Sequence, residues 1–157
     1  MNEPLEYNEI ETLLSFINDS SISIENRLKL TKIIKRFIVI IYIKKKKIIF
    51  YKSDIEKSVS RRGAELILKN NSSWSLPSIE DFNLLIEESK KEVGIEIQDF
   101  EYWAKDSDNT VILYNPRRKT ILTEYNHNQY LNNDGGDFST FTPFNELRSC
   151  LRLVFNI

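Results

Sequence analysis

The feature that most constrains the fold is a run of seven β-branched or aromatic residues, Phe37 to Ile43, followed after four lysines by Ile48 to Tyr51. Such residues favour buried strands, because their stiff side chains pack well on a pleated sheet. The two segments therefore predict two strands joined at Lys44 to Lys47. That turn lacks the Gly or Asn that a tight hairpin prefers, so one long helix from Ile24 to about Lys46 is the competing interpretation.

Two amphipathic helices are expected before these strands. Residues 4–18 begin with Pro4 in the first turn, and their apolar side chains recur at helical spacing. A second helix should begin after Ser23, whose hydroxyl can cap free backbone N–H groups. The apolar stripes are Ile10, Leu13, Leu14 and Ile17 in the first helix, and Leu30, Ile33, Ile34 and Phe37 in the second.

Two further helices are predicted in the middle of the chain. Residues 53–56 match a capping box and predict a helix over 54–69. Ser78 caps the next helix, acidic residues fill its first turn, and Gly94 supplies a left-handed residue at its C-terminal end. Its core face is expected to consist of Phe82, Leu85, Ile86 and Val93.

The remaining third of the chain indicates mainly β-structure. The segment from Ile95 to Trp103 alternates imperfectly and predicts one strand, and residues 110–114 and 119–125 predict a hairpin around a turn that contains Pro116. Residues 126–137 are polar and predict a long loop. Thr142-Pro143 begins a last short helix, which is expected to include Cys150 and to place Phe144, Leu147 and Leu151 on one side.

These elements predict one α+β domain over residues 1–157, with N-terminal helices, a mostly antiparallel sheet and a short C-terminal helix. A chain of 157 residues with 41% hydrophobic and 29% charged residues has the composition of an ordinary globular domain. No internal repeat and no Pro- or Ser-rich linker interrupts it.

Few residues are available for catalysis or for binding a cofactor. The single His127 and single Cys150 exclude two-histidine metal sites and cysteine-based zinc sites, and four glycines leave little material for phosphate-binding loops. One hypothesis is a catalytic pair in which His127 is the base and Cys150 the nucleophile. We expect instead that His127 lies in a loop and that Cys150 is a small buried side chain, and we expect no cofactor or metal. The asparagine-rich segment 132–137 lacks the ligand spacing of a calcium loop.

Residues 106–110, Asp-Ser-Asp-Asn-Thr, fit the DxDxT pattern of haloacid-dehalogenase-like phosphatases, in which the first Asp is the nucleophile. That motif follows an apolar strand near the N-terminus, whereas here Ala104-Lys105 precede it two-thirds of the way along the chain. Asp, Ser and Asn all favour turns. A solvated turn between two strands therefore explains the segment, and we expect a protein that is not an enzyme.

The charges are strongly segregated although the formal net charge is −1. Residues 1–23 hold five acids and no base, residues 24–69 hold fourteen bases and four acids, and residues 70–109 hold ten acids and three bases. Such blocks form opposite patches that attract a charged partner, unless neighbouring segments neutralise one another within the fold.

The function expected from these observations is the binding and neutralising of a basic protein through an acidic surface, as an immunity or inhibitor protein binds a toxin domain such as a nuclease. Aromatic side chains concentrate at protein interfaces, although core or lid positions are the alternative for both tryptophans. The candidate surface consists of Glu80, Asp81, Glu87, Glu88, Glu92, Asp99, Glu101, Asp106, Asp108, Trp74 and Trp103.

Two other functions remain open at this level. Basic residues between 27 and 62 could contact nucleic-acid phosphates, with Tyr42, Phe50 and Tyr51 stacking on bases, although the pI of about 5.9 is low for such a protein. Alternatively, the apolar segments 37–43 or 50–51 form a patch that another subunit covers. The nucleic-acid candidates are Lys44, Lys45, Lys46, Lys47, Arg61 and Arg62.

The sequence also suggests where the protein works. Its acidic N-terminus does not resemble a secretory signal, and its most apolar run is far shorter than the roughly 20 residues of a membrane span. We therefore expect a cytoplasmic protein without a membrane partner. The high Ile, Lys and Asn content is typical of AT-rich genomes, as in many bacteria, phages and mobile elements.

Overall fold

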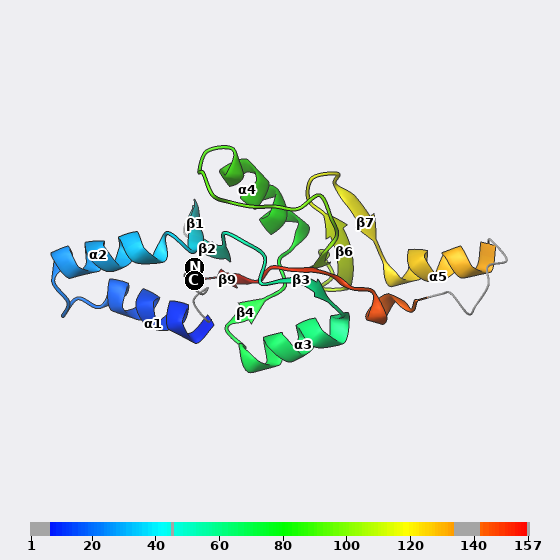
Figure 1. Ribbon diagram of the computed structural model, residues 1–157, viewed down its shortest axis with the longest axis horizontal. Helices are drawn as coiled ribbons and strands as arrows, with labels where there is room; N and C mark the ends of the chain where they lie inside the picture. Colours follow the sequence, from blue (N-terminus) through cyan, green and yellow to red (C-terminus); the bar gives the residue numbers. More distant parts are fainter. Residues whose placement is uncertain (1–6, 45, 134–141, 157) are drawn as a thin grey trace.

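Two mostly antiparallel sheets form the centre of the computed structural model, which describes residues 7–44, 46–133 and 142–156 (Figure 1). The first sheet has the strand order β1 (Ile38–Ile43), β2 (Lys46–Tyr51), β9 (Val154–Asn156), β4 (Trp74–Ser75). The second has the order β3 (Glu56–Val59), β8 (Ser149–Leu151), β5 (Tyr102–Lys105), β6 (Val111–Asn115), β7 (Thr120–Leu122). All pairs are antiparallel except β5 with β8.

Helices surround the sheets, which confirms the predicted α+β class. Figure 1 shows α3 and α4 on opposite sides of the strands, the α1–α2 pair at one end and α5 at the other. A single 3-10 turn, Phe144–Glu146, is the short C-terminal helix. The helix bounds are α1 (Tyr7–Asn18), α2 (Ile24–Ile34), α3 (Arg61–Asn70), α4 (Ile79–Ser89) and α5 (Glu124–Asn133). No helix among the described residues has both the length and the apolar character needed to cross a bilayer.

Both faces of β1 contact a core cluster, which explains why its sequence is apolar instead of alternating; within this strand only Tyr42 is exposed. Val39 and Ile41 belong to the core cluster that includes Phe82 and Leu85 of α4. Ile38 belongs to the opposite cluster, which also holds buried residues of α1, α2 and α3: Ile10, Leu14, Ile34 and Ala64.

The hairpin expected at the lysines is confirmed, and the alternative of one long helix is wrong. Helix α2 ends at Ile34, and β1 pairs with β2 in the register that places Ile43 opposite Lys46. This register leaves a tight turn, and Lys44 adopts a left-handed conformation with φ of 51°. The turn thus forms without the Gly or Asn that normally supplies this conformation.

The helix predicted over 54–69 begins too early. The amide of Ile55 donates to the Leu151 carbonyl, and residues 56–59 form β3, which pairs with β8. Helix α3 starts only at Arg61, where Ser60 accepts a hydrogen bond from the Gly63 amide at 3.2 Å. Pairing with a strand from the other end of the chain therefore overrides the local capping pattern.

Helix α4 has the predicted cap but a different end. The hydroxyl of Ser78 accepts from the Asp81 amide and the Asp81 carboxylate accepts from the Ser78 amide, which is a complete capping box. The helix ends at Ser89, so Gly94 lies in a later turn, with φ of 94°. Val93 is 94% exposed rather than part of the core face, because it lies beyond the helix.

The strand predicted from Ile95 begins only at Tyr102. Residues 95–98 form no strand, although Ile97 is buried, and Phe100 is exposed. The hairpin around Pro116 is confirmed by the antiparallel pairing of β6 with β7, but its second strand ends at Leu122 instead of residue 125. Residues 126–133, where a loop was expected, belong to α5, and 134–137 lie outside the described residues.

The C-terminal region is mainly strand instead of helix. Only one helical turn follows Pro143, and Cys150 lies in β8, which pairs with β3 and β5. Ser149, Cys150 and Leu151 are all buried because both faces of β8 are covered: Leu151 belongs to one core cluster and Cys150 to the other. A short apolar run does not distinguish a buried strand from a helix, which accounts for the wrong prediction.

Candidate functional site

The DxDxT-like segment is a tight turn between β5 and β6. One carboxylate oxygen of Asp106 accepts hydrogen bonds from the amides of Asp108 and Thr110, each at 2.9 Å. Asn109 has a left-handed φ of 61°. The Asp106 carboxylate therefore holds the turn together, as the turn interpretation predicted.

His127 and Cys150 have separate structural roles. His127 lies in α5, and its Nε2 atom is 2.8 Å from the Thr142 carbonyl oxygen. Cys150 is buried, its thiol donates a weak hydrogen bond to the Lys57 carbonyl, and burial together with the nearby Asp54 carboxylate raises the pKa of the thiol to about 11. Because a reactive cysteine needs a lowered pKa, Cys150 has the character of a core residue.

Both tryptophans are core residues, so they do not belong to an exposed binding surface. Trp103 is fully buried, and its indole N–H donates to the Val59 carbonyl at 2.8 Å. Trp74 is buried between the rings of Tyr51 and Phe155, with both centroid distances at 5.4 Å. The core alternative is therefore correct for each ring.

Several of the candidate acidic residues are neutralised by nearby bases, two of them by bases from other segments. Lys52 lies 2.7 Å from Glu92, Lys90 lies 2.8 Å from Glu87, and Arg118 binds Asp99 through two hydrogen bonds of 2.8 and 3.1 Å. The hydrogen bonds from Arg118 hold the pKa of the Asp99 carboxyl below its usual value. The pKa of the Arg118 guanidinium is raised, mainly by Asp99 and in part by the negative charge of Glu101. This part of the acidic segment is a mixed surface.

A more uniformly acidic group lies where α4 begins. The Lys105 amide donates to the Pro77 carbonyl at 3.0 Å, and Ser78 forms a bridge with Lys105, so the end of β5 lies beside the first turn of α4. This contact brings together two segments that are far apart in the sequence. We call the acidic residues of these two segments the α4-start patch: Glu80, Asp81, Asp106 and Asp108.

Within the α4-start patch, two carboxylates build the scaffold and two remain available. Asp81 completes the capping box and Asp106 holds the turn. Glu80 and Asp108 are exposed, and neither forms an ion pair with another described residue. The described residues contain no group of three or more His, Cys, Asp or Glu side chains that could hold a metal ion. Lys105 is the one base in residues 77–81 and 105–108, which hold the four acids of the patch, so this surface has an excess of negative charge.

The described nucleic-acid candidates come from two different parts of the fold. Lys44 lies in the turn between β1 and β2, and the Lys47 ammonium lies 5.8 Å from the exposed ring of Tyr42. Lys46 begins β2, and Lys45 lies outside the described residues. Phe50 and Tyr51 are buried in the core, so they cannot stack on bases. Of the segments 37–43 and 50–51, only Tyr42 is exposed, so these segments offer little apolar surface for another subunit to cover.

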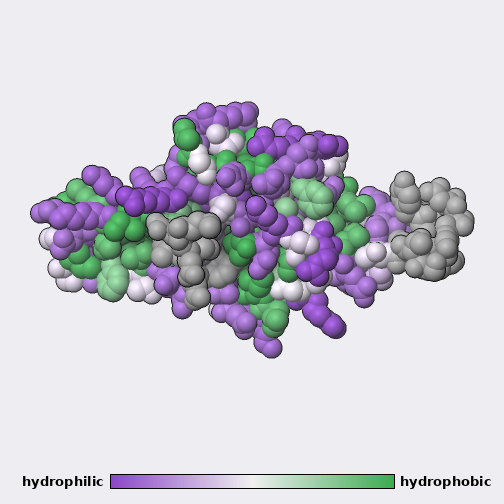
Figure 2. All heavy atoms as spheres, in the orientation of Figure 1, coloured by the Kyte–Doolittle hydropathy of each residue, from purple (hydrophilic) through white to green (hydrophobic). Residues whose placement is uncertain are grey.

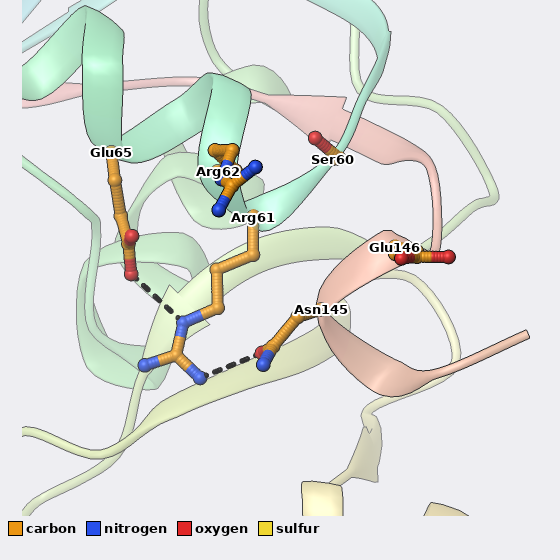
Figure 3. A pocket seen from close by; sticks show the side chains of 6 residues that line it. All are labelled: Ser60, Arg61, Arg62, Glu65, Asn145 and Glu146. Carbon is orange, nitrogen blue, oxygen red and sulfur yellow. Dashed lines mark hydrogen bonds and ion pairs between the residues drawn. The ribbon is translucent and has the colours of Figure 1, made fainter.

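Arg61 and Arg62 line a separate polar cleft of about 490 Å³ between α3 and the 3-10 turn (Figure 3). Arg61 donates to Glu65 and to Asn145, each at 3.0 Å, and lies 3.9 Å from Glu124. Figure 3 shows the Asn145 side chain directed toward Arg61. Arg61 thus links three elements, α3, α5 and the 3-10 turn, and its charge is largely satisfied within the protein.

The sequence analysis did not identify the most buried ion pair among the described residues. Arg152 and Asp54 are almost completely buried, and the Arg152 guanidinium donates to the Asp54 carboxylate at 2.7 Å and to the Glu96 carbonyl. The Tyr102 hydroxyl donates to the same carboxylate at 2.7 Å, and burial raises the pKa of this hydroxyl far above its usual value. Asp54 lies between β2 and β3, and Arg152 between β8 and β9, so the pair joins two of the connections between the sheets. No local pattern links residues so far apart in the sequence.

No protein-family model matches this chain, and no curated protein matches it. The geometry of its own residues is therefore what identifies the α4-start patch as the candidate site.

Proposed function

We propose that this chain is a non-catalytic cytoplasmic protein that binds and neutralises a basic protein partner through the α4-start patch, as an immunity or inhibitor protein binds a toxin domain. A nuclease is the partner class that fits best, because an enzyme that binds nucleic acid presents a basic surface. The observation that carries the proposal is the contact between Pro77-Ser78 and Lys105, which joins two acidic segments on one surface.

The local structure of the patch suits recognition by charge. The capping box at Ser78 and the hydrogen bonds to Asp106 hold both backbones, so Glu80 and Asp108 lose little backbone freedom on binding. Acidic side chains at the first turn of α4 are also in a favourable position relative to the helix dipole. A preorganised acidic surface of this kind increases the association rate with a basic partner and selects against acidic ones.

The roles of the chemically versatile side chains also support binding over catalysis. Asp106 holds a turn, the pKa of the Cys150 thiol is raised, and Asp54 pairs with Arg152 in the interior. Each of these residues therefore has a structural role that explains its presence without a reaction.

Charge reversal separates the patch from the rest of the acidic segment. We would capture partners from a lysate of the source cells with three forms of the chain, elute them with a salt gradient and identify them by mass spectrometry. The patch variant is Glu80→Lys/Asp108→Lys, which spares the two scaffold carboxylates. The matched control is Glu88→Lys/Glu101→Lys, which changes the net charge by the same amount outside the patch, late in α4 and directly before β5.

We expect one basic protein to be retained by the wild type and by the control but not by the patch variant. Retention by the patch variant, or equal loss from both variants, would contradict the proposal. Inhibition of the captured protein's activity by the wild-type chain would then test neutralisation directly.

Nucleic-acid binding is the second candidate, favoured by one observation. Tyr42 is exposed beside Lys47, and this arrangement of a stacking ring with a cation is typical of single-strand binding. Lys44→Glu/Lys47→Glu should then abolish retention of nucleic acid and flatten its salt dependence, whereas the patch variant should leave both unchanged.

A further inference from the structure

The part of the α1–α2 pair from Ser15 to Ile33 exposes several large apolar side chains to solvent. Not one residue from Ser15 to Ile33 is buried. Four large apolar side chains in this segment are 43 to 69% exposed, and Figure 2 shows hydrophobic surface over this end of the molecule. These side chains are Phe16, Ile24, Leu28 and Ile33.

Such an arrangement is unusual for two short helices. Helices of this length are marginal on their own, and in proteins they are stabilised mainly by packing of their apolar faces. In α2, only Ile34 is buried, whereas Ile24 and Leu28 follow one another at four-residue spacing and so occupy one exposed side of the helix. An apolar helix side of this kind is expected to be covered in the functional state.

The charges of α1 and α2 indicate what kind of partner covers this apolar side. Helix α1 carries Glu9 and Glu11 and no base, and Asp19 follows it. Helix α2 is basic, with Arg27, Lys29 and Lys32 against Glu25, and two further bases follow it. The pair is thus an acidic helix beside a basic one.

We propose that a second copy of this chain covers the exposed apolar side, so that the two α1–α2 pairs form a four-helix bundle with twofold symmetry. In this arrangement α1 of each copy lies against α2 of the other, and acidic and basic helices alternate around the bundle. The apolar side chains Ile24 and Leu28 enter its centre. Each charged helix then has two neighbours of opposite sign.

A partner of a single charge sign fits this surface less well. A basic protein would be attracted by α1 and repelled by α2, and a nucleic acid would be attracted by α2 and repelled by α1. A second copy matches both helices at once. The proposal does not depend on the proposed partner, because the α4-start patch lies on different elements, and Figure 1 shows the α1–α2 pair at one end of the molecule.

The first test is the mass of the purified chain in solution, measured by sedimentation equilibrium from low micromolar to several hundred micromolar. We expect a concentration-dependent dimer with twice the mass of the 18.6 kDa chain. Leu28→Glu should raise the dimer dissociation constant by roughly a hundredfold or more, because a twofold dimer loses two buried leucines.

The matched control is Leu66→Glu on α3, since Leu66 is 60% exposed and Leu28 is 58% exposed. We expect the control to dimerise like the wild type. Circular dichroism verifies that both variants keep the fold. A wild type that stays monomeric at every concentration, or a dimer that Leu28→Glu leaves intact, would overturn the proposal.

Charge reversal tests whether α1 of one copy contacts α2 of the other. Glu9→Lys/Glu11→Lys makes α1 basic, and Lys32→Glu/Lys35→Glu makes the end of α2 acidic. Each variant alone should dimerise several-fold more weakly than the wild type, because like charges then face one another. An equimolar mixture of the two variants should recover a heterodimer. Absence of any recovery would overturn the pairing of α1 with α2 between copies.

Discussion

The two-sheet body and the α1–α2 pair contain similar apolar side chains, but the body buries most of them, whereas the part of the helix pair from Ser15 to Ile33 buries none. In the body, Phe82 and Leu85 of α4 are fully buried against strands of both sheets. In the helix pair, no residue from Ser15 to Ile33 is buried. The difference shows that an amphipathic pattern forms a helix in both regions, whereas burial requires an opposing surface from a distant part of the chain.

The ion pairs of the two regions should differ most in their effect on stability. Arg152→Met leaves the Asp54 carboxylate buried without its cation, and we expect the free energy of unfolding to fall by about 3 to 5 kcal/mol. Lys29→Met removes the partner of Glu25 on the exposed surface of α2, and we expect a change of at most about 0.5 kcal/mol. Urea unfolding followed by tryptophan fluorescence measures both.

A double variant distinguishes loss of the ion pair from loss of packing. If unpaired charge causes the damage, Asp54→Asn/Arg152→Met should be more stable than the sum of the two single changes predicts. Simple additivity of the two changes would attribute the loss to packing alone.

Replacing a leucine by alanine in each region should give the next largest difference in the free energy of unfolding. Leu85→Ala opens a cavity in the fully buried core and should cost about 2 to 5 kcal/mol. Leu28→Ala removes a largely exposed side chain and should cost at most about 0.5 kcal/mol in protein dilute enough to be monomeric. Thermal unfolding at low concentration compares them, and an equal loss for both would show that Leu28 packs within its own chain.

The smallest expected contrast concerns how stability depends on pH. The body should lose stability at alkaline pH through Cys150, and the helix pair should lose stability at acid pH through Asp19. The pKa of the Cys150 thiol is raised to about 11, so its contribution is complete below the unfolded pKa of about 8.5 and is lost as pH rises toward 11. Hydrogen bonds from Ser21 lower the pKa of the Asp19 carboxyl, so its contribution is complete above about pH 3.9 and is lost as pH falls.

Urea midpoints between pH 3 and pH 11 would measure both effects. Cys150→Ala should flatten the alkaline decline only, and Asp19→Asn should flatten the acid decline only. A change in the alkaline limb on replacing Asp19 would contradict this assignment.

Much of the secondary structure was predictable because its causes are local. The caps at Ser23 and Ser78 and the strands on both sides of Lys44 depend on neighbours within a few residues. The capping pattern at 53–56 was misleading for the opposite reason. Asp54 is bound by Arg152 and Tyr102, and the following strand pairs with β8 from the far end of the chain.

The candidate site was predictable in its residue types but not in its grouping. Glu80 and Asp108 were both among the acidic candidates, as were Glu92 and Asp99. The bridge between Ser78 and Lys105 separates the first two from the others, which lie beside Lys52 and Arg118. A charge is neutralised or left free by its neighbours in space, and linear segregation of charge does not specify them.

The α+β class, the amphipathic helices and the scarcity of catalytic side chains can be read from the sequence, because each follows from composition or from interactions between near neighbours. The three-dimensional fold was needed to choose the lysine turn over one long helix and to show that Trp74 and Trp103 are core residues. The same holds for the pairing of Arg152 with Asp54 and for the uncovered apolar side of the α1–α2 pair. Burial and charge pairing are properties of contacts between distant segments, and those contacts exist only once the sheets have formed.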